Sequence, residues 1–239
     1  MSLRPSFTEQ EPLPGLPAGD VCPPELVERL ASVRVVAVFT VTTAQEALPL
    51  CRALYDGGIR AIELAWRTPA TLGALAAIVK EMPEMFTGVG SLLSEEQVRA
   101  AKSTGAHFGV SPGMSVAVVR AARRVGLPYA PGVQTPSDIQ AAIEQGCRLL
   151  KYFPAESAGG LAHLRSVHAP FAHLGLRYVA LGGIDELKAA GYLAEPCIAA
   201  VGGSWIAPAA LVRRGAWDEI RQNAAAACAL AARTERSAA

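Results

Sequence analysis

The stretch VVAVFTVTTAQEALPLCRALYDGGIRAIELAW, residues 35–66, shows the pattern on which the fold of this chain depends. It begins with a β-branched and apolar run, 35–41, which predicts a buried strand. An amphipathic stretch, 43–58, follows and ends at two glycines, as helices commonly do. A second apolar run, 59–66, predicts another strand. A strand, a helix and a strand in this order predict a βαβ unit with parallel strands.

The same alternation continues along the chain. Further apolar runs predict strands at residues 86–90, 106–111, 127–132, 147–153, 177–183 and 197–203, with helical patterns between them. Eight strands alternating with helices favour a (β/α)8 TIM barrel, here with an N-terminal helix. A doubly wound open sheet is the alternative. The lack of a G-x-G-x-x-G motif after the first strand weakens the dinucleotide-binding form of that alternative.

Two predicted helices begin with residues that are typical of N-caps. Thr68, followed by Pro69, is the predicted N-cap of the helix after the second strand, and Ser94 is the predicted N-cap of the next helix. Residues 1–23 are rich in proline and polar residues and have no apolar signal-peptide core. We therefore expect a flexible leader, 1–23, ahead of one barrel domain at 24–239.

Composition excludes several classes of protein. The formal net charge is +1 and no block is rich in lysine and arginine, which argues against nucleic acid or an anionic membrane surface as the main partner. No apolar run approaches the ~18–20 residues of a membrane span. The five cysteines are dispersed without a C-x-x-C pair, which predicts free thiols and a cytoplasmic location.

One lysine stands inside an apolar strand, in CRLLKYFPAES at residues 147–157. Burying Lys151 charged and unpaired would cost several kcal/mol. An apolar pocket favours the neutral amine, which can attack a ketone and form a Schiff base. There are two non-catalytic alternatives. The ammonium group of Lys151 could reach solvent at the barrel end, or it could form a structural ion pair with Glu63.

The second strand carries two charged residues on one face. Side chains alternate along a strand, so Glu63 and Arg67 point into the predicted barrel mouth. Glu63 is a candidate for moving protons, and Arg67 offers a planar fork for the carboxylate of a keto acid. The alternatives are an internal salt bridge, or an arginine in solvent beyond the end of the strand.

Two strands end in glycine pairs, in ALGGID at 180–185 and in AVGGSW at 200–205. The loops after the seventh and eighth strands of a TIM barrel often bind phosphate, and glycines let backbone N–H groups approach an anion. Ser204 would add a hydroxyl donor. We therefore predict a phosphate site here, with ordinary turns as the alternative.

Seven motifs in order, IELAWRT, GVGSLL, FGVSPG, PGVQTPSD, LLKYFPAE, LGGI and VGGSW, resemble the 2-keto-3-deoxy-6-phosphogluconate (KDPG) aldolase family over about residues 30–220. That family includes 4-hydroxy-2-oxoglutarate (KHG) aldolase activity. The resemblance implies a class I aldolase, usually a homotrimer. Such an enzyme cleaves KDPG reversibly to pyruvate and glyceraldehyde 3-phosphate, or KHG to pyruvate and glyoxylate.

The resemblance also implies roles for particular residues. Lys151 would form the Schiff base with pyruvate, and Glu63 would be the general acid/base, moving protons through a bound water. Arg67 would bind the pyruvate carboxylate, helped by the hydroxyl of Ser91. No cofactor is implied, because the lysine–pyruvate imine is itself the electron sink.

The remaining implied residues form the walls and the far end of the site. Pro112 and Phe153 would line the pocket, and Gly182, Gly183 and Ser204 would hold the phosphate of the substrate. The four histidines show no H-x-H or H-E-x-x-H pattern, which disfavours a metal-dependent aldolase. We expect them to be surface or packing residues.

Four positions depart from the family pattern. Ala65 and Ser91 stand where threonine is usual or common, Leu181 where KDPG-preferring members often carry threonine, and Ala37 where proline is common. These changes do not affect the Schiff-base residues. They do affect the part of the site that selects the aldehyde half of the substrate, so the identity of that aldehyde is not determined. Two other hypotheses are a phosphate-binding barrel isomerase or synthase without imine chemistry, and a barrel that serves only as a binding module.

Overall fold

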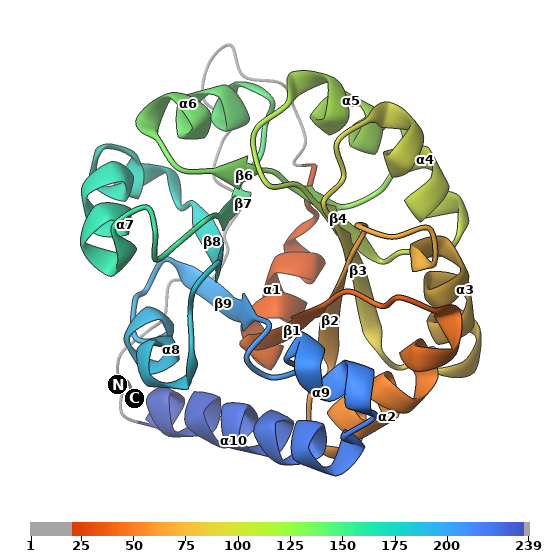
Figure 1. The fold of residues 1–239 in the computed structure, drawn as a ribbon. Helices are drawn as coiled ribbons and strands as arrows, with labels where there is room; N and C mark the ends of the chain where they lie inside the picture. The colour runs from red at the N-terminus through yellow and green to blue at the C-terminus, as the bar shows by residue number, and fades with distance from the viewer. Residues whose placement is uncertain (1–20, 237–239) are drawn as a thin grey trace.

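A computed structural model describes residues 21–236 of the chain. Parallel strands form a ring that is surrounded by helices, which confirms the predicted barrel (Figure 1). The strands are β1 Val35–Phe39, β2 Ala61–Ala65, β3 Phe86–Gly90, β4 Phe108–Val110, β5 Tyr129–Ala130, β6 Gly132–Val133, β7 Leu149–Tyr152, β8 Arg177–Leu181 and β9 Ile198–Gly203. Their order in the sheet is β5-β4-β3-β2-β1-β9-β8-β7-β6.

The predicted strand at 127–132 differs from the others because Pro131 divides it into β5 and β6. The first part pairs with β4, where Gly109 is the partner of Tyr129, and the second part pairs with β7. Proline has no N–H to donate to a ladder, so a strand is readily interrupted there. The nine observed segments of the described chain therefore correspond to the eight predicted strands.

Helices lie between successive strands and around the ring (Figure 1). They are α1 Pro24–Val33, α2 Ala47–Asp56, α3 Thr71–Glu81, α4 Glu95–Ser103, α5 Val116–Val125, α6 Pro136–Glu144, α7 Gly160–His168, α8 Glu186–Leu193, α9 Ala209–Arg214 and α10 Trp217–Arg236. Short 3-10 turns occur at Ala44–Glu46 and Ala169–Leu174. Within 21–236, no helix is both long enough and apolar enough to cross a membrane.

One of the two predicted helix caps is confirmed and the other is wrong. The hydroxyl of Ser94 accepts a hydrogen bond from the N–H of Gln97 at 3.2 Å, as an N-cap does. Helix α3 begins only at Thr71, and the Thr68 hydroxyl donates instead to the carbonyl of Val41 at 2.7 Å. Thr68 thus ties the loop after β2 to the end of β1 rather than capping a helix.

Two apolar clusters hold the barrel together. One lies between the strands and the outer helices, and it contains the side chains of β2 that point outward, Ile62 and Leu64. The other lies inside the barrel, where Phe86, Phe108 and Leu149 meet the buried face of α1. Helix α1 therefore closes the N-terminal end of the barrel, and the carboxyl ends of the strands are left for a site.

The predicted leader falls mostly outside the described residues. Positions 1–20 are not described. Of the last three leader residues, Val21 and Cys22 are buried in the core, at 6% and 0% exposed. Among the described residues, the buried part of the chain therefore begins at Val21, three residues before the predicted domain start.

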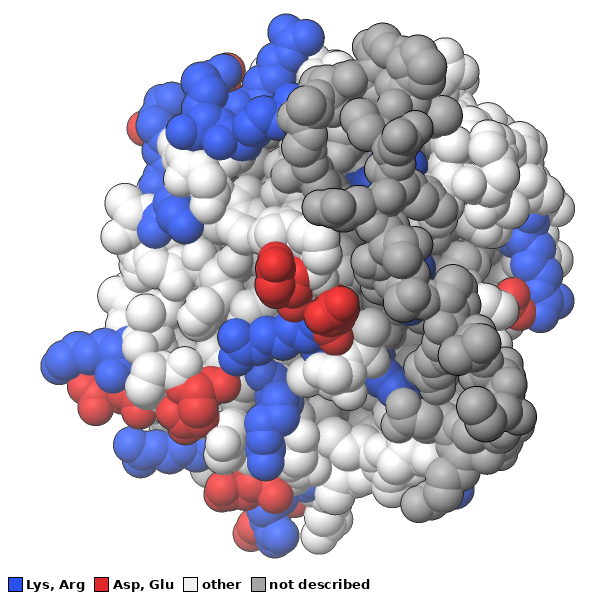
Figure 2. Space-filling model, turned by 180° about the vertical axis from the view of Figure 1, so that it is seen from behind, with Lys and Arg blue, Asp and Glu red and all other residues white. Residues whose placement is uncertain are grey.

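Charged side chains of both signs are spread over the face seen in Figure 2, and a group of basic side chains lies in the region of α4 and α5. Arg124 of α5 pairs with Glu95 of α4 at 2.6 Å. Arg120 and Arg123 both donate to Gln145. These basic side chains are thus hydrogen-bonded to neighbours within the same chain.

Candidate active site

Lys151 lies inside the barrel, as the strand pattern predicts. Its neighbours in β7, Leu150 and Tyr152, point outward into the cluster beneath the helices. Lys151 is 4% exposed, and its Nζ atom donates to both oxygens of Glu63, at 2.8 Å to Oε1 and 3.2 Å to Oε2. Two predictions are thereby confirmed: burial of the lysine, and its approach to Glu63 across the barrel.

An ion pair between Lys151 and Glu63 could serve the stability of the fold or the chemistry of the site. Removing two charges from water costs several kcal/mol per ion, and the attraction between them offsets this only with good geometry. Such a pair is therefore a weak source of stability. The same 2.8 Å contact is within the range for direct proton transfer between an amine and a carboxylate. The geometry therefore allows a proton to pass between the two groups.

Gly90 of β3 makes room for the carboxylate. It is the register partner of Ala65 on the neighbouring strand β2. A Cβ atom at Gly90 would lie 2.0 Å from Oε1 of Glu63, far inside van der Waals contact. Sequence reasoning did not single out this glycine. Its signal was the alternation in FTGVG, which places Gly88 and Gly90 on the same face of the strand.

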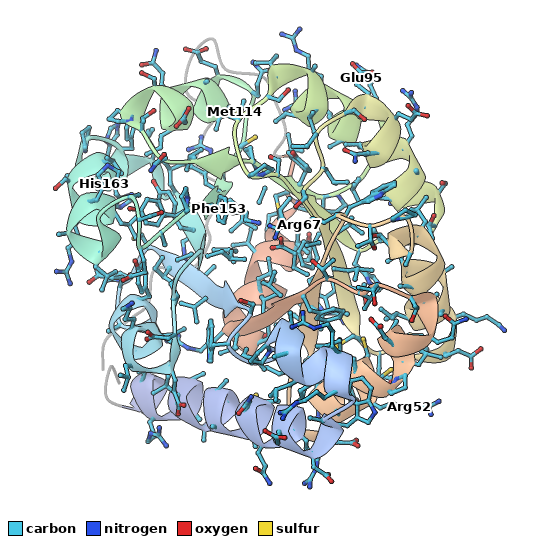
Figure 3. All side chains as sticks on the ribbon, in the orientation of Figure 1. Arg52, Arg67, Glu95, Met114, Phe153 and His163 are labelled. Atoms are coloured by element: carbon cyan, nitrogen blue, oxygen red, sulfur yellow. The ribbon has the colours of Figure 1, made fainter. Side chains whose placement is uncertain are left out.

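The amine and the carboxylate open onto a pocket of about 590 Å³ at the carboxyl ends of the strands. Arg67 and Phe153 line this pocket, and Figure 3 shows both near the centre of the barrel. The Nε atom of Arg67 donates to the Ser91 hydroxyl at 3.4 Å. Ser91 has a left-handed backbone, φ 62°, which directs the chain sharply after β3. Ser91 therefore contacts the guanidinium, as expected for a helper of Arg67.

Pro112 lies beside this pocket rather than in its wall. It borders a smaller cavity of about 150 Å³, and Phe153 borders both spaces. Gly132 allows the two loops to approach, because a Cβ atom there would lie 2.3 Å from the Pro112 carbonyl. Phe153 is thus common to the walls of both cavities, whereas Pro112 borders only the smaller one.

The glycine pairs meet at the other side of the large pocket. Gly182 and Gly183 have left-handed backbones, with φ of 100° and 78°. Among the described residues, no acceptor is recorded for the backbone N–H groups of five pocket-lining residues, Gly182, Gly183, Ile184, Ser204 and Trp205. Unpaired N–H groups in the wall of a cavity can bind an anion that enters it. The predicted phosphate residues therefore lie together, and Ile184 and Trp205 join them.

The charged groups lining the large pocket are Glu63, Arg67 and Lys151. Two cations and one anion leave the base of the pocket positive, which suits a substrate that carries a carboxylate. An amine, a proton acceptor and a guanidinium in one pocket can form an imine with a keto acid. Thr40 also lines this pocket and was not predicted from the sequence.

The histidines pack against other groups of the fold. The Nδ1 atoms of His163 and His168 lie 2.8 Å and 3.3 Å from the hydroxyls of Tyr152 and Tyr178. Burial lowers the pKa of His168 below its ordinary value. Within residues 21–236, no group of three or more His, Cys, Asp and Glu residues could hold a metal ion. The expectation that these histidines are packing residues is confirmed for His163 and His168.

Comparison with known proteins identifies relatives that cover most of this chain. A model of the family described as KDPG and KHG aldolase matches residues 26–223. A 2-dehydro-3-deoxy-phosphogluconate aldolase of Treponema pallidum is 38% identical over 195 residues, which are 82% of this chain and 92% of the relative.

Two solved structures share the fold. KDPG aldolase from Legionella pneumophila, with pyruvate captured at low pH as a covalent carbinolamine intermediate, matches with a TM-score of 0.81 and 31% identity, covering 85% of this chain and 97% of that one. KDPG aldolase of Zymomonas mobilis with 3-phosphoglycerate matches with a TM-score of 0.78 and 32% identity, covering 85% and 95%.

Proposed function

The chain is a member of the KDPG and KHG aldolase family of carbon–carbon lyases, and from this premise we propose that it cleaves KDPG reversibly through an imine on Lys151. The products are pyruvate and glyceraldehyde 3-phosphate. The observation that carries the proposal is the buried Lys151 amine, 2.8 Å from the Glu63 carboxylate at the base of a pocket. The covalent pyruvate adduct of the Legionella relative supports it.

The first half of the reaction makes the imine. Glu63 takes a proton from the Lys151 ammonium, and the neutral amine attacks the C2 ketone to give a carbinolamine. Glu63 then returns a proton to the carbinolamine hydroxyl, which leaves as water. The nitrogen of the resulting iminium is positive and can accept an electron pair from a neighbouring C–C bond.

The second half breaks the carbon chain. A carboxylate, Glu63 directly or through a water, removes the proton of the C4 hydroxyl. The C3–C4 electron pair moves into the iminium, the aldehyde leaves, and an enamine remains. Protonation at C3 and hydrolysis of the imine release pyruvate and restore Lys151. Protons and electrons balance without a redox partner.

The two anionic ends of the substrate fit opposite sides of the pocket. The guanidinium of Arg67, held by Ser91, binds the carboxylate next to the ketone. The unpaired N–H groups at Gly182, Gly183 and Ser204 receive the phosphate. The 3-phosphoglycerate in the Zymomonas relative supports a phosphorylated three-carbon fragment.

Trapping with pyruvate and borohydride tests the imine directly. The protein is incubated with pyruvate, reduced with borohydride and digested, and the mass of each peptide is measured by mass spectrometry. We expect one stable adduct on the peptide of Lys151, and none on the peptide of Lys188, which serves as an internal control. A protein that forms no adduct on Lys151 would refute the imine and leave the isomerase or synthase alternative, since that chemistry needs no imine.

Two apolar side chains in the pocket bear on which aldehyde the enzyme releases. Ala65 and Leu181 both line the pocket, at positions where the family resemblance predicts threonine. KHG is therefore a second candidate substrate, because its glyoxylate half carries no phosphate and fewer hydroxyls. Comparing kcat/KM for KDPG, its galacto epimer and KHG decides between these substrates.

Removal of the Ser204 hydroxyl should weaken binding of phosphorylated substrates. In Ser204→Ala we expect KM for KDPG to rise about fivefold, the effect of losing one hydrogen bond of ~1 kcal/mol. KM for KHG should stay within twofold. Ser166→Ala on the surface of α7, where the hydroxyl bonds its own helix, is the matched control. An equal rise for both substrates would remove Ser204 from the phosphate site.

A methyl group at Gly90 should displace the Glu63 carboxylate. We expect Gly90→Ala to lower kcat by about tenfold or more and to destabilise the fold by about 1–3 kcal/mol, as overpacking does. Steady-state kinetics and a thermal melt measure the two effects. The control is Gly73→Ala, whose new Cβ would make an ordinary 3.5 Å contact. Wild-type kcat in Gly90→Ala would show that Glu63 needs no such space.

Three broader expectations stay proposals. The barrel forms one domain at 24–239, the enzyme is a homotrimer, and it acts in the cytoplasm. The five cysteines are free thiols in the structure, which is consistent with a reducing compartment. Size-exclusion chromatography with light scattering tests the trimer.

A further inference from the structure

Two loops at the phosphate end of the pocket are joined backbone to backbone. We call residues 182–185 the glycine turn. The N–H of Ala155 donates to the carbonyl of Leu181 at 2.8 Å, and the N–H of Glu156 donates to the carbonyl of Gly182 at 2.9 Å. A Cβ atom at Gly183 would lie 2.8 Å from Cβ of Glu156. The glycine turn therefore rests directly on the loop that follows the strand of the reactive lysine.

Lys188 of α8 joins the same two loops through its side chain. Its ammonium lies 3.2 Å from Oε2 of Glu156, 3.4 Å from Oδ2 of Asp185 and 3.5 Å from the carbonyl of Gly183. The other oxygen of Glu156 accepts from the buried Tyr192 hydroxyl at 2.7 Å. The hydrogen bond to Glu156 raises the pKa of Lys188 above its ordinary value. Lys188 thus bridges an anchored carboxylate and the glycine turn.

These contacts fix which way the peptide groups of the glycine turn face. In a trans peptide, the carbonyl of one residue and the N–H of the next point in opposite directions. The Gly182 carbonyl is bonded to Glu156, so the N–H of Gly183 points away from that loop. The Gly183 carbonyl faces Lys188, so the N–H of Ile184 points away from Lys188. Both residues line the pocket, and both N–H groups lack an acceptor among the described residues.

We propose that Lys188 and Glu156 are positioning residues, which hold the glycine turn with its N–H groups facing the phosphate of the substrate. This inference rests on the proposed function, because it concerns the phosphorylated end of that substrate. Lys188 acts through the turn, and it is not among the residues that line the large pocket. Its contribution should therefore appear in the binding of phosphate and not in the chemistry at Lys151.

The first experiment compares Lys188→Met with wild type on two substrates. We expect KM for KDPG to rise about tenfold while kcat stays within twofold, the pattern of lost ground-state and transition-state binding. KM for the unphosphorylated KHG should stay within twofold. Lys80→Met is the matched control, because Lys80 lies on the surface of α3 in an exposed pair with Glu81.

A second variant separates positioning from simple charge attraction. If Lys188 acted only as a cation near the phosphate, removing the negative charge in Glu156→Gln would lower KM for KDPG. Positioning predicts the opposite, a rise of about threefold, and a double variant no worse than Lys188→Met because the two residues act as one unit. A fall in KM, or additive effects, would overturn the proposal.

The outcomes also separate this inference from the proposed function. Wild-type enzyme that forms no pyruvate adduct on Lys151 and cleaves neither substrate would refute the proposed function, and the inference with it. Wild-type enzyme that cleaves KDPG, with KM unchanged in Lys188→Met, would refute the inference alone. Equal losses on KDPG and KHG together with a lowered Tm would assign Lys188 a general structural role and also refute it.

Discussion

Replacing Lys151 with methionine is expected to abolish aldol cleavage, with kcat falling by at least about 10⁴-fold, because Lys151 is the one lysine among the described residues that line the large pocket. Methionine has nearly the length of lysine and is apolar, so it can occupy the same space inside the barrel. Circular dichroism should show an unchanged fold, and borohydride trapping should yield no adduct at position 151. Near-native turnover in this variant would refute the imine mechanism.

The variant leaves Glu63 without its partner, and this has a cost of its own. Removing one member of a buried ion pair destabilises proteins by roughly 3–5 kcal/mol. Here the carboxylate faces a large pocket that water can enter, which reduces the penalty. The double variant Lys151→Met/Glu63→Gln removes the unpaired charge. It should recover thermal stability without recovering activity, which separates a chemical loss from an unfolded protein. Lys102→Met, on the surface of α4, should behave like wild type.

The second large effect is expected for Glu63→Gln. The amide keeps the shape of the side chain and can still accept a hydrogen bond from Lys151, but it cannot take up a proton. Loss of a general acid/base usually lowers the rate about 10²–10⁴-fold, and we expect kcat to fall within that range. KM should change little, because Arg67 and the glycine turn still bind the two ends of the substrate.

Two partial reactions locate the defect in Glu63→Gln. Imine formation is followed by the rate of borohydride-trapped adduct, and protonation of the enamine by exchange of the pyruvate methyl protons in D₂O, observed by NMR. Both rates should fall together if one carboxylate serves both steps. Wild-type exchange in this variant would mean that another group moves the proton. Glu81→Gln, at the exposed end of α3, is a control for a surface carboxylate.

Much of the site could be predicted from the sequence because strand side chains alternate with a period of two. Once residues 59–66 and 147–153 are predicted to be strands, the parity of Glu63 and Lys151 follows, and a closed barrel brings them together. Arg67 lies two residues beyond the end of β2, so its place in the pocket depends on the loop and not on strand parity. The glycine pairs were predictable for a similar reason, since adjacent strands of a parallel barrel end at the same rim.

Other features depend on contacts between distant segments and could not be predicted locally. The space at Gly90 exists only because β2 and β3 pair in a register that brings Glu63 over it. Thr68 precedes a proline, as an N-cap would, yet its hydroxyl bonds Val41, which comes close only after β1 and β2 have paired. The bridge made by Lys188 likewise depends on how two loops pack. Such distances between segments far apart in the chain cannot be predicted from the local sequence.

The interruption at Pro131 divides the barrel into two arcs of consecutive chain. The first arc, β1 to β5, carries Glu63 and Arg67, and the second, β6 to β9, carries Lys151 and both glycine pairs. They meet at the interruption and again where β1 pairs with β9. Neither half-barrel holds a complete set of reacting groups. Two fragments made by cutting the chain at this point would each lack aldolase activity. Activity in a mixture of the two would show that they assemble into a complete barrel.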